Sequence, residues 1–148
     1  MSFITYLING ISLGSVYALI ALGYTMVYGI AKMLNFAHGD VIMIGAFTTY
    51  SLCSTMGLPP VVGVAASVIV CTVLGILIEK IAYKPLRKAS SPLAVLITAI
   101  GISYLLQNLA LLMFGANAKS FTSVVSVAPL TLAGGQIKIS GETIVTIL

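Results

Sequence analysis

The chain has 148 residues, of which 59% are hydrophobic and 7% are charged, whereas about a quarter of an average soluble chain is charged. This composition and a mean hydropathy of +1.16 exclude a soluble domain. The net charge of +4 has no basic stripe or nucleic-acid motif beside it, so we predict an all-α integral membrane protein in a lipid bilayer, with no nucleic-acid partner.

Long stretches without charged side chains predict where the chain crosses the membrane. A spanning helix needs about 20 mostly apolar residues, and residues 1–31, 41–78 and 89–118 carry no charge. Pro59-Pro60 divides the second stretch, because consecutive prolines end a helix. We therefore predict four spans, over residues 4–31, 41–56, 61–81 and 93–114.

The last part of the chain has a different composition. Residues 115–141 are rich in Ser, Thr and Gly, and β-favouring runs at 124–132 and 136–139 flank Ala133-Gly134-Gly135. This pattern predicts a β-hairpin in a loop outside the membrane. From residue 142 the sequence is apolar again, as at the start of a fifth helix. We therefore expect residues 1–148 to be a single, incomplete transmembrane domain.

The distribution of Lys and Arg predicts the orientation. Lys32 follows the first span, and a basic cluster follows the third, whereas the turn at 57–60 is uncharged. Because Lys and Arg mark cytoplasmic loops, these two loops are predicted to be cytoplasmic. The N-terminus and the loop 115–141 are then extracytoplasmic, with Lys119 and Lys138 as the minority on that side.

Small residues recur within the predicted spans at helical spacing. Such stripes allow helices to approach closely in lipid, and they could also line a path for a solute. We expect helix packing to be the main role of this set: Gly10, Gly14, Gly45, Gly63, Ser67 and Gly75.

The clearest polar feature is the block Asn35–Asp40 between the first two spans, which contains the only histidine of the chain, His38. In one interpretation Asn35 and Asp40 cap the next helix. In the other, the chain breaks at Gly39 and the block faces a solute path, where His38 is a donor or a pH-sensitive gate.

Gln107 lies one turn from Ser103 in the fourth span, where it either bonds a neighbouring helix or contacts substrate. The translocation or gating candidates are Asn35, His38, Gly39, Asp40 and Gln107, with Gly29, Gly39 and Gly45 as points of backbone freedom. No catalytic, cofactor-binding or metal-ligating residue is predicted.

The N-terminal sequence resembles the LivH-type permeases, the membrane subunits of branched-chain amino-acid ABC importers. The resemblance extends over residues 3–114 and is most specific in four segments: residues 10–23 (GISLGSVYALIALG), 26–30 (MVYGI), 35–40 (NFAHGD) and 44–47 (IGAF).

This resemblance implies a helical permease of about twice this length in a bacterial or archaeal plasma (inner) membrane. It implies a second, LivM-like permease subunit, two cytoplasmic ATPase subunits that hydrolyse ATP, and an extracytoplasmic solute-binding protein. The expected activity is alternating-access import of branched-chain amino acids or a related small solute. An ion-coupled secondary transporter or channel is the alternative, although spans 3 and 4 offer no intramembrane proton relay.

Overall fold

The computed structural model describes residues 2–86, 92–120, 130–132 and 137–139. The chain divides into two units, one formed by Val27–Thr122 and the other by the residues before and after it. Within the described residues three helices are long and apolar enough to cross a membrane, namely Phe3–Ala31, Pro60–Leu86 and Leu93–Phe114. These helices make the chain a polytopic helical membrane protein, as its composition predicts.

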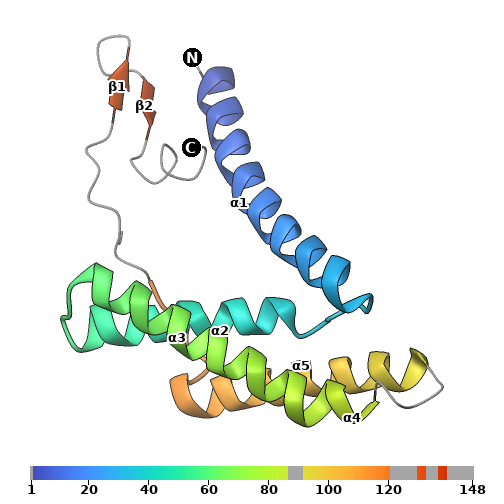
Figure 1. The fold of residues 1–148 in the computed structure, drawn as a ribbon. Coiled ribbons are helices and arrows are strands. Elements are labelled where there is room, and N and C mark those ends of the chain that lie inside the picture. The colour runs from blue at the N-terminus through green and yellow to red at the C-terminus, as the bar shows by residue number, and fades with distance from the viewer. Residues whose placement is uncertain (1, 87–91, 121–129, 133–136, 140–148) are drawn as a thin grey trace. The chain divides into compact units, whose positions relative to one another are not determined.

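The first helix, α1, extends over Ser2–Ala31 (Figure 1). It ends where Lys32 adopts a left-handed conformation with a φ of 55°. The Lys32 N–H donates to the Tyr28 carbonyl at 2.8 Å and so closes the last helical turn. Left-handed residues commonly end helices, although glycine is the usual choice. The break between the first two helices therefore begins at Lys32.

Helix α2, His38–Tyr50, continues without interruption into the π-helical segment η1, Ser51–Thr55. This helix overlaps the predicted second span, residues 41–56, but it is not among the three apolar helices. Its length is about 27 Å at 1.5 Å per residue, slightly less than the hydrocarbon core of about 30 Å. Its first turn also contains His38 and Asp40. Its short length and its polar first turn together distinguish this helix from the three apolar helices.

Helix α3, Pro60–Ile78, folds back against α2 after a tight turn. Gly57 has a φ of 68° in this turn, a conformation that glycine adopts without the strain of a side chain. The Leu58 N–H donates to the Leu52 carbonyl at 3.0 Å. Pro60 is the first residue of α3, where its missing N–H has no helical partner to lose. The preceding helix thus ends before the turn at Gly57, and Pro60 starts the next.

Helix α3 continues into the π-helical segment η2, Glu79–Tyr83, and the short helix α4, Lys84–Leu86. Helix α5, Pro92–Phe114, packs against α2. The Phe114 ring stacks on Phe47 of α2 with 4.6 Å between ring centroids. Helix α2 therefore lies in contact with both α3 and α5, and this three-helix arrangement positions the polar block (Figure 1).

Few large side chains are buried within the described residues. The buried apolar residues are Ala37, Tyr83, Ala99, Leu106 and Ala110, while most large aliphatic and aromatic side chains are exposed. Exposed apolar surface of this extent marks contact with lipid or with other proteins. The helices therefore do not form a self-contained core.

Strands β1, Leu130–Leu132, and β2, Ile137–Ile139, pair antiparallel with Leu130 opposite Ile139. They fall within the two β-favouring runs of the sequence. The residues that connect them and the predicted fifth helix from residue 142 lie outside the described residues. The position of this loop outside the membrane stays a prediction.

Candidate functional site

Asp40 is the centre of a polar cluster between α2 and α5. Its side chain is 8% exposed. The Ser103 hydroxyl donates to Oδ2 at 2.5 Å, and the Gln107 side-chain amide donates from Nε2 to Oδ1 at 3.0 Å. Gln107 also donates to the Ser103 oxygen at 3.1 Å. We call Asp40, Ser103 and Gln107 the α2–α5 cluster.

The α2–α5 cluster follows from simple helix geometry. Ser103 and Gln107 are four residues apart, so they occupy one face of α5, and Asp40 is in the first turn of α2. Both carboxylate oxygens receive hydrogen bonds from neutral donors. Because an ionisable side chain within a membrane helix is expensive unless paired, this arrangement makes Asp40 a strong candidate for function.

Asn35 forms a second polar contact, with the segment η2. Its Oδ1 accepts from the Ala37 N–H at 3.1 Å and from the Tyr83 hydroxyl at 2.7 Å. Tyr83 is only 4% exposed. The contact joins residues that are 48 positions apart, so it holds the segment before α2 against η2.

The helix-capping interpretation of the block is wrong. The residue that precedes α2 is Ala37, and no side chain caps the helix. Asn35 instead stabilises the turn before α2, and Asp40 bonds to α5. The first N–H group of α2 bonds to the backbone, since the His38 N–H donates to the Asn35 carbonyl at 3.2 Å. Asn35 and Asp40 therefore bond to other elements, η2 and α5, and neither caps α2.

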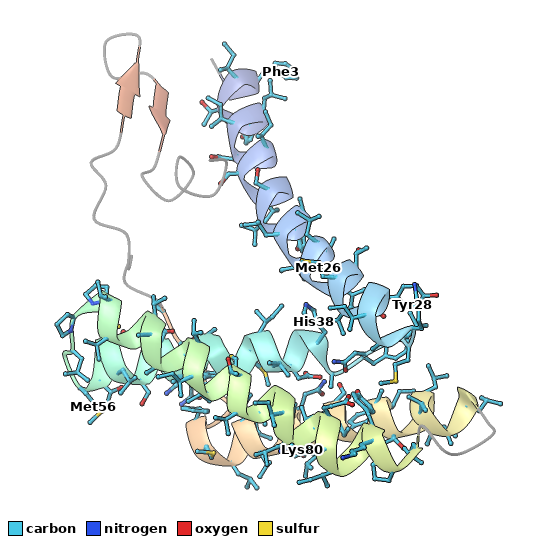
Figure 2. All side chains as sticks on the ribbon, viewed as in Figure 1. Phe3, Met26, Tyr28, His38, Met56 and Lys80 are labelled. Carbon is cyan, nitrogen blue, oxygen red and sulfur yellow. The ribbon has the colours of Figure 1, made fainter. Side chains whose placement is uncertain are left out.

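His38 and Gly39 lie between these two polar contacts. His38 is half-buried at the start of α2, at the opposite end of the α2–η1 helix from Met56 (Figure 2). Gly39 is exposed and helical, and a Cβ there would have no atom within 4 Å. The helix does not break at Gly39, because the break between α1 and α2 precedes His38.

The small residues fall into two groups. A Cβ at Gly45 would lie 2.8 Å from the Cys71 sulfur and 3.1 Å from the Ser67 oxygen, and one at Gly63 would collide with the Cys53 sulfur. These residues let α2 and α3 approach closely. In contrast, a Cβ would meet nothing within 4 Å at Gly10, Gly14 or Gly75. The packing role of these three glycines stays a prediction.

The sequence profile of the family described as "Branched-chain amino acid transport system / permease component" matches residues 6–148. The chain belongs to this permease family. It is 43% identical over 150 residues to the high-affinity branched-chain amino acid transport system permease protein BraD of Pseudomonas aeruginosa, an alignment that covers 96% of this chain and 48% of BraD.

Two further relatives are permease proteins of the same description. LivH of Salmonella typhimurium is 45% identical over 114 residues, and LivH of Escherichia coli strain K12 is 42% identical over 114 residues. Each alignment covers 72% of this chain and 37% of the relative. The chain thus spans about half the length or less of the curated relatives it matches. No solved structure matches it.

In this member of the permease family, sequence reasoning missed the roles of Tyr83 and Ser103. The spacing of Ser103 and Gln107 was visible, but their partner Asp40 is more than 60 positions away. No local pattern indicates that Tyr83 bonds Asn35. Within the described residues there is also no group of three His, Cys, Asp or Glu side chains that could hold a metal ion. The candidate site therefore consists of helix-to-helix hydrogen bonds.

Proposed function

We propose that this chain is a membrane-spanning part of an ABC importer permease that moves branched-chain amino acids, or a related small solute, by alternating access. The observation that carries this proposal is the family match over residues 6–148. BraD and LivH, whose names describe branched-chain amino acid transport, support the substrate class. The permease itself performs no catalysis in this proposal.

The proposed partners are a second permease subunit, LivM-like, two cytoplasmic ATPase subunits and an extracytoplasmic solute-binding protein. The exposed apolar surface of the helices supports contact with further membrane helices. The proposed location is the plasma or inner membrane, with the N-terminus extracytoplasmic. The basic residues around Lys84 support that orientation, because they would lie on the cytoplasmic side.

Within this proposal, the block Asn35–Asp40 and Gln107 form the element that responds to the transport cycle. Asn35 joins the block to η2, and Asp40 joins it to α5. Side-chain hydrogen bonds between membrane helices contribute about 0.6 kcal/mol each on average, so a conformational cycle can break and remake them. His38 and Gly39 lie between the two contacts and would move with them.

Reconstitution tests the proposed function. The chain, assembled with its partner permease, ATPases and binding protein in proteoliposomes, should take up leucine only when ATP is present. Uptake that persists without ATP would favour an ion-coupled secondary transporter or channel, an alternative that the relatives' names do not favour. Transport by Asp40→Asn and His38→Ala at wild-type rates in a correctly assembled complex would show that the block is structural only.

Orientation is tested separately by labelling. After removal of the native cysteines, Lys119→Cys should react with a membrane-impermeant maleimide added outside intact cells, because residue 119 is exposed. Lys84→Cys, which is also exposed, should react only after the cells are opened. The reverse pattern would overturn the proposed orientation.

A further inference from the structure

A pocket of about 240 Å³ lies beside the Asn35–Tyr83 contact. It is formed entirely by residues of the Val27–Thr122 unit, from the end of α1, the segment before α2, and α2, α3 and η2. A water molecule needs about 10–15 Å³ of such space, so the pocket has room for a small solute. The pocket is separate from the α2–α5 cluster, because none of the three residues of that cluster lines it.

The lining of the pocket is amphipathic. Asn35, Glu79 and Tyr83 supply the polar groups, and Val27, Val41 and Ile78 are among the apolar ones. Glu79 and Tyr83 are four residues apart in η2, and the Tyr83 hydroxyl bonds Asn35. The polar residues Glu79 and Tyr83 therefore belong to the η2 side of the pocket, where Tyr83 also contacts Asn35. Aliphatic residues supply much of the rest.

The hydrogen bonds determine what Asn35 offers to a ligand. Its Oδ1 already accepts from the Ala37 N–H and the Tyr83 hydroxyl. Because a backbone N–H can only donate, the oxygen must face it, and this orients the amide. The two N–H groups of Nδ2 can then donate to another acceptor. A ligand carboxylate is a suitable acceptor for them.

Glu79 can bind a group of opposite charge. This residue lines the pocket and also interacts with another group of the chain. Since a carboxylate has about four acceptor positions, it can still receive N–H bonds from an ammonium group. None of the described residues that line the pocket is a Lys, Arg or His. This lining disfavours phosphate-bearing ligands such as lipid headgroups, which need cationic partners.

Local backbone geometry provides independent support. Glu79 begins η2, and the Lys84 N–H donates to the Glu79 carbonyl five residues earlier, as in a π-helix. Such π-helical turns are rare and occur frequently at functional sites. Gly75, one turn before Glu79, also lines the pocket, and a Cβ there would meet nothing within 4 Å. The absence of a side chain at this position keeps the space open.

We propose that this pocket binds the transported solute itself, as a zwitterionic amino acid with an aliphatic side chain. The ammonium group contacts the Glu79 carboxylate, the carboxylate contacts Asn35 Nδ2, and the side chain lies against Val27, Val41 and Ile78. The identity of the solute rests on the proposed function, whereas the position of the site rests on the pocket.

Equilibrium binding of radiolabelled leucine tests this proposal. The transporter is assembled in nanodiscs without the solute-binding protein, so that only membrane sites contribute. Wild type should bind leucine, and Glu79→Gln should weaken binding about tenfold, as expected when a charge-assisted contact becomes neutral. Gly75→Leu, which fills the pocket, should remove binding. ATP-driven uptake of leucine in proteoliposomes is measured in parallel.

Two matched controls test the specificity of these effects, one in η2 and one in α5. Lys80→Gln removes a charge from an exposed neighbour of Glu79, and Gly101→Leu adds a side chain at an open helical glycine outside the pocket. Both should bind leucine as wild type does. Two leucine analogues complete the test, 4-methylpentanoate without the ammonium group and isoamylamine without the carboxylate. Each should compete at least about tenfold less well than leucine, since each lacks one charged contact.

The outcomes separate this proposal from the proposed function. If the wild-type transporter imports leucine with ATP but binds no leucine in nanodiscs, the pocket assignment is overturned and the proposed function is not. Wild-type affinity in assembled Glu79→Gln would also overturn it, even if Gly75→Leu fails to assemble. Equal competition by either analogue would contradict the zwitterion. No ATP-driven uptake by wild type would instead refute the proposed function.

Discussion

The α2–α5 cluster makes a quantitative prediction about stability. Ser103→Ala deletes the donor to Oδ2 of a carboxylate that is only 8% exposed. Hydrogen bonds to charged groups contribute about 1.5–3 kcal/mol in soluble proteins, whereas hydrogen bonds between membrane helices contribute about 0.6 kcal/mol on average and at most about 1.7 kcal/mol. We expect a loss of about 1–2 kcal/mol in the free energy of unfolding, because Asp40 stays buried with one donor fewer.

Asp40→Leu turns this expectation into a double-mutant cycle. Leucine has the branched shape of aspartate with methyl groups in place of the oxygens, so it removes the acceptor and keeps the volume similar. In that background Ser103→Ala should cost much less, because only the exposed bond from Gln107 remains to be lost. The coupling energy should then be about 1–2 kcal/mol, well above the 0.3–0.5 kcal/mol of scatter expected for independent sites.

Equilibrium unfolding in mixed micelles of increasing SDS content measures the cycle. Thr98→Val in the same helix is the control, because the Thr98 hydroxyl donates only to the Ala94 carbonyl one turn earlier. It should change stability by less than about 0.5 kcal/mol. A coupling energy between Ser103 and Asp40 no larger than the scatter would refute the idea that this contact holds α2 against α5.

Two further predictions concern packing and the second polar contact. Gly45→Ala should destabilise the α2–α3 pair by about 1–3 kcal/mol, since its Cβ would lie 2.8 Å from the Cys71 sulfur. Gly39→Ala on the same helix should stabilise the protein by about 0.5–1 kcal/mol, because a Cβ at this position would meet no atom within 4 Å. Equal shifts of the melting temperature for Gly45→Ala and Gly39→Ala would contradict this prediction. Tyr83→Phe should cost about 1 kcal/mol by deleting the hydroxyl that bonds Asn35, and an unchanged melting temperature would argue against that contact.

Helices were predictable from the sequence where hydrophobicity alone determines them. Residues 4–31 lie within α1, and residues 93–114 lie within α5, because long apolar runs allow few alternatives in lipid. The turn at Pro59-Pro60 was equally visible, since proline is favoured in the first turn of a helix and Pro60 begins α3. The helix at 38–55 shows the limit of this reasoning. Its polar first turn is tolerated because tertiary contacts satisfy Asp40, and no hydropathy pattern contains that information.

The candidate site was predictable as a location but not as a set of contacts. Asn35, Asp40 and Gln107 stood out because polar side chains are rare in this chain. Their partners could not be inferred, because the bond from Tyr83 to Asn35 and the bond from Ser103 to Asp40 each join segments that are far apart in the sequence. Such pairings depend on how helices pack, and local spacing does not encode packing.

Helix α2, which carries Asp40, is held differently on its two sides. Its α3 side is held by close packing at Gly45, where an added Cβ would lie 2.8 Å from the Cys71 sulfur. Its α5 side is held at Asp40 by hydrogen bonds to two side chains, which can be exchanged at modest cost. A cycle of conformations would therefore keep α2 and α3 together as one rigid pair and change the α2–α5 contact. Disulfide cross-links test this asymmetry, since a bond across α2 and α3 should leave transport intact and one across α2 and α5 should stop it.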